Sequence, residues 1–144
     1  MANTCEFVVG KLLEIRVADG YRSVEDIDTM IHMIRLNMMK LGPSDKMTIV
    51  ADWTAVHVMQ PETAARAREM LATVNPKVAR SSILTGPEHP TTNLQVVRLI
   101  REAQNADRKH FTDAKQLESW LSPVLSAPEA VRLRAFLGID LAGW

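Results

Sequence analysis

The chain has 144 residues, 17 basic and 17 acidic side chains, and one cysteine. A chain of this length can bury enough apolar surface to fold as one domain without disulfides, and its balanced charge excludes disordered chains and basic nucleic-acid binders. It contains no run of about 18 to 20 apolar residues and no basic-then-apolar leader, so we expect a cytoplasmic protein without integral membrane association.

Five short runs of apolar and β-branched residues predict strands. They cover residues 5–9, 12–18, 47–51, 78–85 and 108–111. Gly10-Lys11 separates the first two runs, and glycine at the first position of a two-residue loop is typical of a type II′ turn, because that position requires a positive φ. The chain is therefore expected to open with an antiparallel hairpin.

Helix-start patterns and apolar periodicity predict five helices. They cover residues 23–41, 61–74, 92–105, 113–121 and 126–137. In the helix at 92–105 we expect Leu94, Val97 and Ile100 to point inward, with Val96 as a further candidate. Gly138 is expected to end the last helix as a C-cap.

The alternation of strands and helices is typical of an α/β fold whose parallel strands are joined by right-handed crossovers. Together with the opening hairpin, it predicts a mixed sheet of four or five strands flanked by four or five helices. We expect residues 1–125 to form the domain. Residues 126–144 are expected to form a C-terminal helical extension, packed on that domain or swapped from it.

Three segments carry a family pattern. Residues 12–26 contain Leu-Leu-Glu-Ile-Arg-Val-Ala-Asp-Gly-Tyr and then Ser-Val-Glu-Asp, and residues 49–56 read Ile-Val-Ala-Asp-Trp-Thr-Ala-Val. Residues 111–121 read Phe-Thr-Asp-Ala-Lys-Gln-Leu-Glu-Ser-Trp-Leu. Together they resemble the STAS family of sulfate-transporter and anti-sigma-factor-antagonist domains, in particular its bacterial SpoIIAA-like branch. The resemblance implies a STAS-like fold and a non-catalytic regulatory module that acts through protein contacts.

The chain departs from this family at the loop that decides regulation. Regulatory STAS domains carry a serine at the start of the helix after their central loop, and its phosphorylation breaks a protein interaction. The matching position here is Pro61, which has no hydroxyl, and Thr63 lies two residues further on. We therefore expect that the usual phosphorylation switch is missing.

The loop after the third strand is the first candidate contact region for a ligand or partner. Its candidate residues are Asp52, Trp53, His57, Met59 and Gln60. Open α/β sheets bind ligands at the carboxyl ends of their strands, so an enzyme that uses Asp52 with His57 or His89 is one alternative. An Asp after a buried strand more often accepts N–H groups of the next turn, and we predict no catalytic residue.

Other polar clusters are weaker candidates. Thr85, Thr91 and Thr92 lie around a helix start and either bind an anion or cap the helix. His32, His57, His89 and His110 do not have a metal-binding spacing, so we expect no metal and no cofactor. The basic residues between Arg98 and His110 lack aromatic neighbours for base stacking, which argues against a nucleic-acid partner.

The first predicted helix has a second apolar strip, Met33, Leu36 and Met39, away from its main apolar face. Such a strip indicates either a surface for a protein partner or homodimer, or cover by the C-terminal helices. Residues 1–62 carry 6 basic and 9 acidic side chains, and residues 63–144 carry 11 and 8, a division that would orient two copies. The alternative is a small apolar or lipid-like ligand in a pocket lined by Met30, Met38, Met59 or Trp53.

Overall fold

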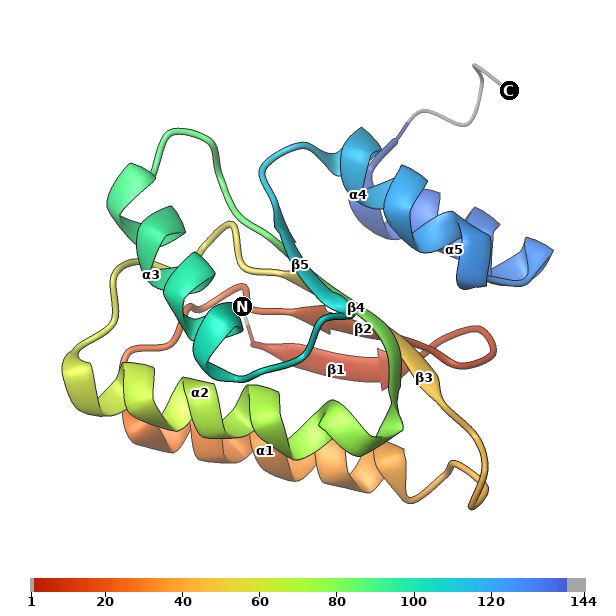
Figure 1. The fold of residues 1–144 in the computed structure, drawn as a ribbon, viewed down its shortest axis with the longest axis horizontal. Helices are drawn as coiled ribbons and strands as arrows, with labels where there is room; N and C mark the ends of the chain where they lie inside the picture. Colours follow the sequence, from red (N-terminus) through yellow and green to blue (C-terminus); the bar gives the residue numbers. More distant parts are fainter. Residues whose placement is uncertain (1, 140–144) are drawn as a thin grey trace.

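One mixed sheet separates two groups of helices (Figure 1). The computed structural model describes residues 2–139. The strands are β1 (Thr4–Phe7), β2 (Leu12–Arg16), β3 (Met47–Asp52), β4 (Val78–Leu84) and β5 (Arg108–Phe111). The helices are α1 (Val24–Met38), α2 (Pro61–Val74), α3 (Pro90–Glu102), α4 (Ala114–Leu121) and α5 (Ala127–Leu137), with short 3-10 turns at Asn75–Lys77 and Ser122–Val124. The predicted α/β class is confirmed.

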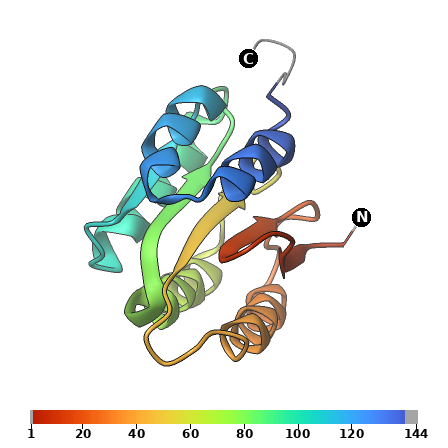
Figure 2. The same ribbon diagram turned by 90° about the vertical axis from the view of Figure 1, so that its right-hand side faces the viewer.

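The strands lie in the sheet in chain order. β1 pairs with β2 in antiparallel fashion, and β2 through β5 are parallel. Each parallel crossover advances in the same direction, and right-handed crossovers of this kind place their helices on one face of the sheet. α1, α2 and α3 therefore share one face, and α4 and α5 lie across the other face (Figure 2).

Alternating strand residues supply two separate apolar cores. In β2, Leu13 and Ile15 point to the core under α1, α2 and α3. Leu12 points the other way and, with Val50 of β3, packs against α4 and α5. The period of two along each strand thus distributes one sequence between two layers.

Helix α5 is held on the sheet by charged and polar contacts, one of them to the buried Glu14 carboxylate, as well as by apolar contacts. Glu14 of β2 is 3% exposed and accepts hydrogen bonds from Nε and Nη2 of Arg132, at 2.7 and 2.8 Å. Arg16 donates to the Phe136 carbonyl oxygen at 2.9 Å. Residues 126–139 therefore pack on the same sheet as the rest of the chain, and residues 140–144 lie outside the described part.

The hairpin turns at Gly10-Lys11, as predicted, but β1 and β2 pair one residue away from the register that a two-residue loop gives. The Leu12 amide donates to the Val9 carbonyl across Gly10-Lys11, and Gly10 has a φ of +59°. Phe7 nevertheless pairs with Leu13, whereas a two-residue loop would pair Val9 with Leu12. Glu129 of α5 accepts the Lys11 amide at 2.7 Å, and a Cβ on Gly10 would lie 2.4 Å from the same carboxylate. The positive φ therefore favours glycine here, and the Glu129 carboxylate would have to move to admit a Cβ.

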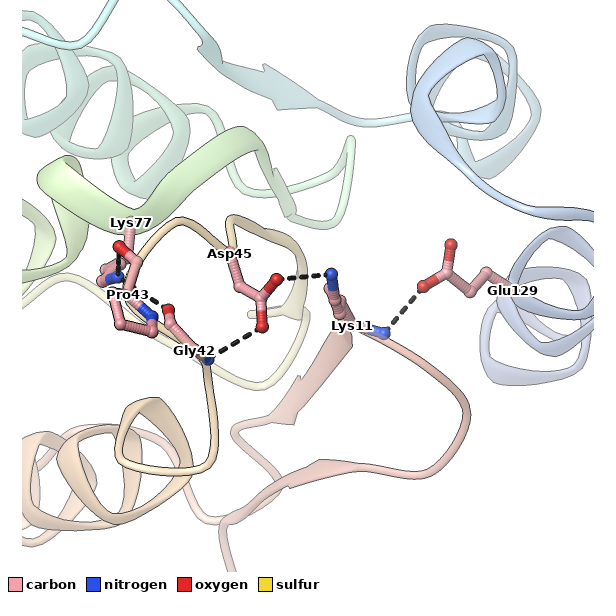
Figure 3. A network of polar contacts seen from close by, with 6 residues as sticks. All are labelled: Lys11, Gly42, Pro43, Asp45, Lys77 and Glu129. Atoms are coloured by element: carbon pink, nitrogen blue, oxygen red, sulfur yellow. Dashed lines mark hydrogen bonds and ion pairs between the residues drawn. The ribbon is translucent and has the colours of Figure 1, made fainter.

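A polar network ties the amino ends of the parallel strands together (Figure 3). It contains Lys11, Gly42, Pro43, Asp45, Lys77 and Glu129. Asp45 accepts from Lys11 Nζ at 2.8 Å and from the Gly42 amide at 2.7 Å, and these bonds lower the pKa of the Asp45 carboxyl. Lys77 donates to the Gly42 and Pro43 carbonyls at 3.2 and 2.9 Å. This edge of the sheet is braced by four segments far apart in sequence.

The predicted inward face of α3 is wrong for Leu94 and Val97, whereas Ile100 and the further candidate Val96 do pack against the core. Leu94 and Val97 are 73% and 46% exposed, whereas Thr92, Val96 and Leu99 are buried. The helix begins at Pro90, two residues before the expected start. Its sequence is apolar on both sides, and packing against α2 and β5 selects the side that contains Val96 and Leu99.

Two of the predicted helix starts show how caps depend on context. At the predicted start of α5, Ser126 and Glu129 form a capping box. The Ser23 side chain makes no capping bond at α1, and Asp26 instead accepts the Arg22 amide at 2.8 Å. No helix among residues 2–139 is both long enough and apolar enough to cross a membrane.

Replacing Arg132, the partner of the buried Glu14 carboxylate, tests how α5 is attached to the sheet. We expect Arg132→Met to lower the free energy of unfolding by about 2–3 kcal/mol, because the Glu14 carboxylate stays buried without its partner. Glu14→Leu combined with Arg132→Met should recover most of this loss. Urea unfolding measures both effects.

Arg98→Met is the matched control, because Arg98 is exposed and its ion pair with Glu102 spans one helical turn. It should change stability by less than about 1 kcal/mol. Equal losses in Arg132→Met and Arg98→Met would contradict the proposed attachment.

Candidate functional site

The carboxyl ends of β2, β3 and β4 meet at the edge opposite the polar network. Residues 18–22 and the loop at 54–60 form a groove of about 450 Å³ at this edge, which we call the loop groove. Its lining includes Tyr21, His57, Met59 and Gln60. Ligand sites of open α/β sheets lie at this edge, and the groove has the volume of a small-molecule or peptide site.

Asp52 ends β3 but does not line the loop groove. Its Oδ2 accepts from Arg16 Nη1 at 2.6 Å, and its Oδ1 accepts the Thr54 amide and hydroxyl at 2.9 and 2.7 Å. Both carboxylate oxygens are thus engaged in holding the turn and β2. The arrangement fits the structural interpretation of Asp52 over an acid-base role.

The candidate loop residues divide into buried and exposed sets. Trp53 is 1% exposed and meets the Tyr21 ring edge-on, with 5.3 Å between centroids. Met59 is 4% exposed. His57 and Gln60 are exposed. Trp53 continues the helix-facing side of β3, so it and Met59 anchor the loop, and only His57 and Gln60 are offered to a ligand.

Gln95 of α3 fixes the loop in place, a role that sequence reasoning missed. Its Oε1 accepts the Met59 amide at 2.9 Å, and its Nε2 donates to the Met59 carbonyl at 3.0 Å. A side-chain amide that pairs with both backbone groups of one residue acts like a short piece of sheet. No local pattern in the sequence signals this long-range contact.

These two hydrogen bonds, which we call the Gln95 clamp, join α3 to the loop. Val58, next to Met59 in the loop, is 52% exposed, and Leu94 and Val97 are exposed on a different side of α3 from Gln95. A second groove, of about 280 Å³, runs between α2 and α3 and is lined by Met59, Gln95, Ala64 and Arg98 among others. The two grooves share Met59 as a lining residue, and Val58 lines the loop groove.

The structure does not gather the three candidate threonines into an anion site. Thr85 is 2% exposed, and its hydroxyl lies 2.6 Å from His110 Nε2 and hydrogen-bonds to Asn93. Thr92 is buried in the core and Thr91 is exposed. Thr85 is thus part of a polar network that fixes the start of α3, and burial lowers the pKa of His110.

The histidines at this edge do not form a metal cluster. The His57 and His89 rings lie 5.8 Å apart between centroids, and His89 Nε2 lies 3.3 Å from a Glu88 oxygen. Within residues 2–139 no three His, Cys, Asp or Glu side chains are placed to hold a metal ion. The enzyme alternative would need Asp52 to act with His57 or His89. Asp52 is bound to Arg16 and Thr54 outside the loop groove, whereas His57 lines the groove.

The strip on α1 is less exposed than its spacing suggests. Met33 is half-buried and packs against the larger core, whereas Leu36 and Met39 are 49% and 79% exposed. The described parts of α4 and α5 lie on the far face of the sheet and do not cover this strip (Figure 2). Two residues of the strip therefore face solvent.

The hydrogen bond between Thr85 and the partly buried ring of His110 predicts that the stability of the fold depends on pH. The pKa of His110 is lowered in the fold, so the unfolded chain binds a proton more readily below pH 6.5. We expect the free energy of unfolding to fall between pH 7 and pH 5, and His110→Gln to flatten this slope. Urea unfolding across this range measures it. His32→Gln, on an exposed residue, should keep the wild-type slope, and an unchanged slope in His110→Gln would refute the assignment.

Breaking the clamp predicts a local opening. Gln95→Ala should lower the free energy of unfolding by about 1–2 kcal/mol and speed hydrogen exchange of the Met59 amide, because two hydrogen bonds are lost. Gln116→Ala, an exposed glutamine on α4, is the matched control. If the Met59 amide exchanges equally fast in both variants, Gln95 does not hold the loop.

Comparison with known proteins adds no relative to this picture. A scan against protein-family models, a search of curated proteins and a search of solved structures each found no match.

Proposed function

We propose that this protein is a non-catalytic binding module that acts through contact with a partner protein. The contact surface consists of Val58, Leu94 and Val97 with the neighbouring Arg98 and Arg101, and we call it the α3 face. The observation that carries the proposal is the exposure of three apolar side chains: Leu94 and Val97 on α3, at 73% and 46%, and Val58, at 52%, in the loop that Gln95 ties to this helix. Clustered exposed apolar side chains are typical of protein interaction sites.

The chemistry of the α3 face favours a partner with apolar residues flanked by acidic ones. Leu94 and Val97 lie one turn apart on α3, and Arg98 and Arg101 are exposed beside them. Arg98 pairs only loosely with Glu102, at 3.4 Å. Acidic side chains on the partner would meet these guanidinium groups at the rim, where charge complementarity sets orientation and association rate.

The surroundings of the polar candidates support a role without catalysis. The Asp52 carboxylate is engaged by Arg16 and Thr54, and the Thr85 hydroxyl is buried. The kinship with the SpoIIAA-like branch is part of this proposal and rests on the three sequence segments. Pro61 begins α2, and Thr63 is 3% exposed, which supports the absence of a phosphorylation switch at this loop.

Self-association through α1 is a second candidate, favoured by the 79% exposure of Met39 and the 49% exposure of Leu36. The acidic first portion and basic remainder of the chain would help two copies orient. The apolar-ligand alternative has less support, because the internal cavity beside Trp53 measures only about 30 Å³.

Site-specific photo-crosslinking tests the α3 face. A benzophenone amino acid at Val97 should crosslink to a partner protein in the cells that make this chain. Leu94→Glu in the same chain should reduce the yield at least about tenfold, because it places a charge in the centre of the contact. Mass spectrometry of the product identifies the partner, and binding of that purified partner to wild type and Leu94→Glu measures the affinity loss.

The control position is Val131, on α5 at 44% exposure, on the opposite side of the sheet. Equal products from Val97 and Val131, or a Val97 product that Leu94→Glu leaves unchanged, would refute the α3 face. A product of twice the chain mass from a probe at Leu36, together with a dimer in light scattering, would favour the second candidate.

A further inference from the structure

The larger core contains a cavity of about 30 Å³ between the sheet and helices α1 and α2. Its walls are apolar side chains such as Ile49, Trp53 and Met70, and all its lining residues are buried. Arg108, at the start of β5, is the one charged residue among them. A charged side chain that lines an apolar cavity among buried residues requires an explanation.

Arg108 is only partly satisfied. The residue is 3% exposed, and its Nη2 donates to the Leu71 carbonyl near the end of α2, at 2.9 Å. Its Nε and Nη1 have no hydrogen-bond partner among the described residues. Burial lowers the pKa of Arg108 to about 10, so the guanidinium still carries its charge at neutral pH. The carbonyl at the helix end offsets part of this charge, but no carboxylate lines the cavity.

The size and the polar lining of the cavity limit what completes this site. A water molecule needs about 10–15 Å³ measured in this way, so 30 Å³ admits about two waters or one small ion. Ser81 and Tyr21 are the other polar lining residues, and the Tyr21 hydroxyl meets only the Met70 sulfur, at 3.9 Å. Sulfate and phosphate exceed the available space, and a cation would be repelled by the guanidinium.

We propose that Arg108 binds a small monovalent anion in this cavity. Any suitable ion carries one negative charge, accepts hydrogen bonds from the guanidinium N–H groups and fits between the apolar walls. A halide and formate both meet this description, and acetate, which has four heavy atoms, probes the upper limit of size. The anion neutralises the buried charge, so its occupancy adds to the stability of the fold through mass action.

Trp53 offers a direct reporter, because it lines the same cavity and bromide quenches tryptophan fluorescence on contact. The chain has three tryptophans, and Trp120→Phe with Trp144→Phe leaves Trp53 as the sole emitter. In this background we expect sodium bromide, at ionic strength held constant with sodium sulfate, to quench Trp53 saturably. Chloride, formate and acetate are then added in separate experiments, and an anion that competes with bromide for the cavity should restore the emission.

Arg108→Gln in the same background should shift the half-saturation point at least about tenfold or abolish saturation. Arg68→Gln, on the exposed side of α2, is the matched control and should leave the curve unchanged. Quenching that rises linearly with bromide, with the same slope in all three proteins, would show that the cavity holds water only and would overturn the proposal.

The competition arms keep the proposal falsifiable if Arg108→Gln fails to fold, as judged by far-UV circular dichroism. Saturable quenching that a competing monovalent anion reverses in the Arg108 protein supports the site. Quenching that none of chloride, formate and acetate reverses overturns it. This test is independent of the proposed function, because the α3 face lies at the surface and the Arg108 cavity lies in the core between the sheet and helices α1 and α2.

Discussion

The direction of the three parallel crossovers constrains the rest of this fold. Because each crossover is right-handed and each advances the same way across the sheet, α1, α2 and α3 must share one face. That geometry leaves the second face apolar, with Leu12 and Val50 to be covered. The end of the chain covers it, and the Glu14–Arg132 pair and the Arg16 contact to Phe136 hold α5 there.

The two edges of the sheet consequently have different character. At the amino ends of the parallel strands, Asp45, Lys11, Lys77 and Glu129 join four segments in one polar network (Figure 3). At the carboxyl ends, the loops stand apart and leave the loop groove. The Gln95 clamp holds one of these loops against α3, and exposed apolar side chains lie in this loop, at Val58, and on the helix, at Leu94 and Val97. Fixing the loop before binding reduces the conformational entropy that is lost when a partner binds.

The polar side chains that were candidates for catalysis or anion binding are engaged in structural hydrogen bonds. Asp52 stabilises a turn and an adjacent strand, and Thr85 with His110 fixes the start of α3. Arg108 differs from them, because two of its nitrogens have no partner among the described residues. The core under α1, α2 and α3 therefore contains a buried cation whose hydrogen bonding is incomplete, while the proposed partner contact depends on apolar side chains at the surface.

The sequence by itself determined the α/β class, the order of the elements, the glycine turn at Gly10 and the start of the last helix at Ser126, because these depend on neighbours within a few residues. It located the loop at 52–60 but not the division into buried Trp53 and Met59 and exposed His57 and Gln60. Only the tertiary structure decided the hairpin register, the inward side of α3 and the role of Gln95. α3 is apolar on both sides, so the packing of α2 and β5 had to select one. Contacts such as Glu14 with Arg132 and Gln95 with Met59 join residues 118 and 36 positions apart, and no local periodicity encodes such distances.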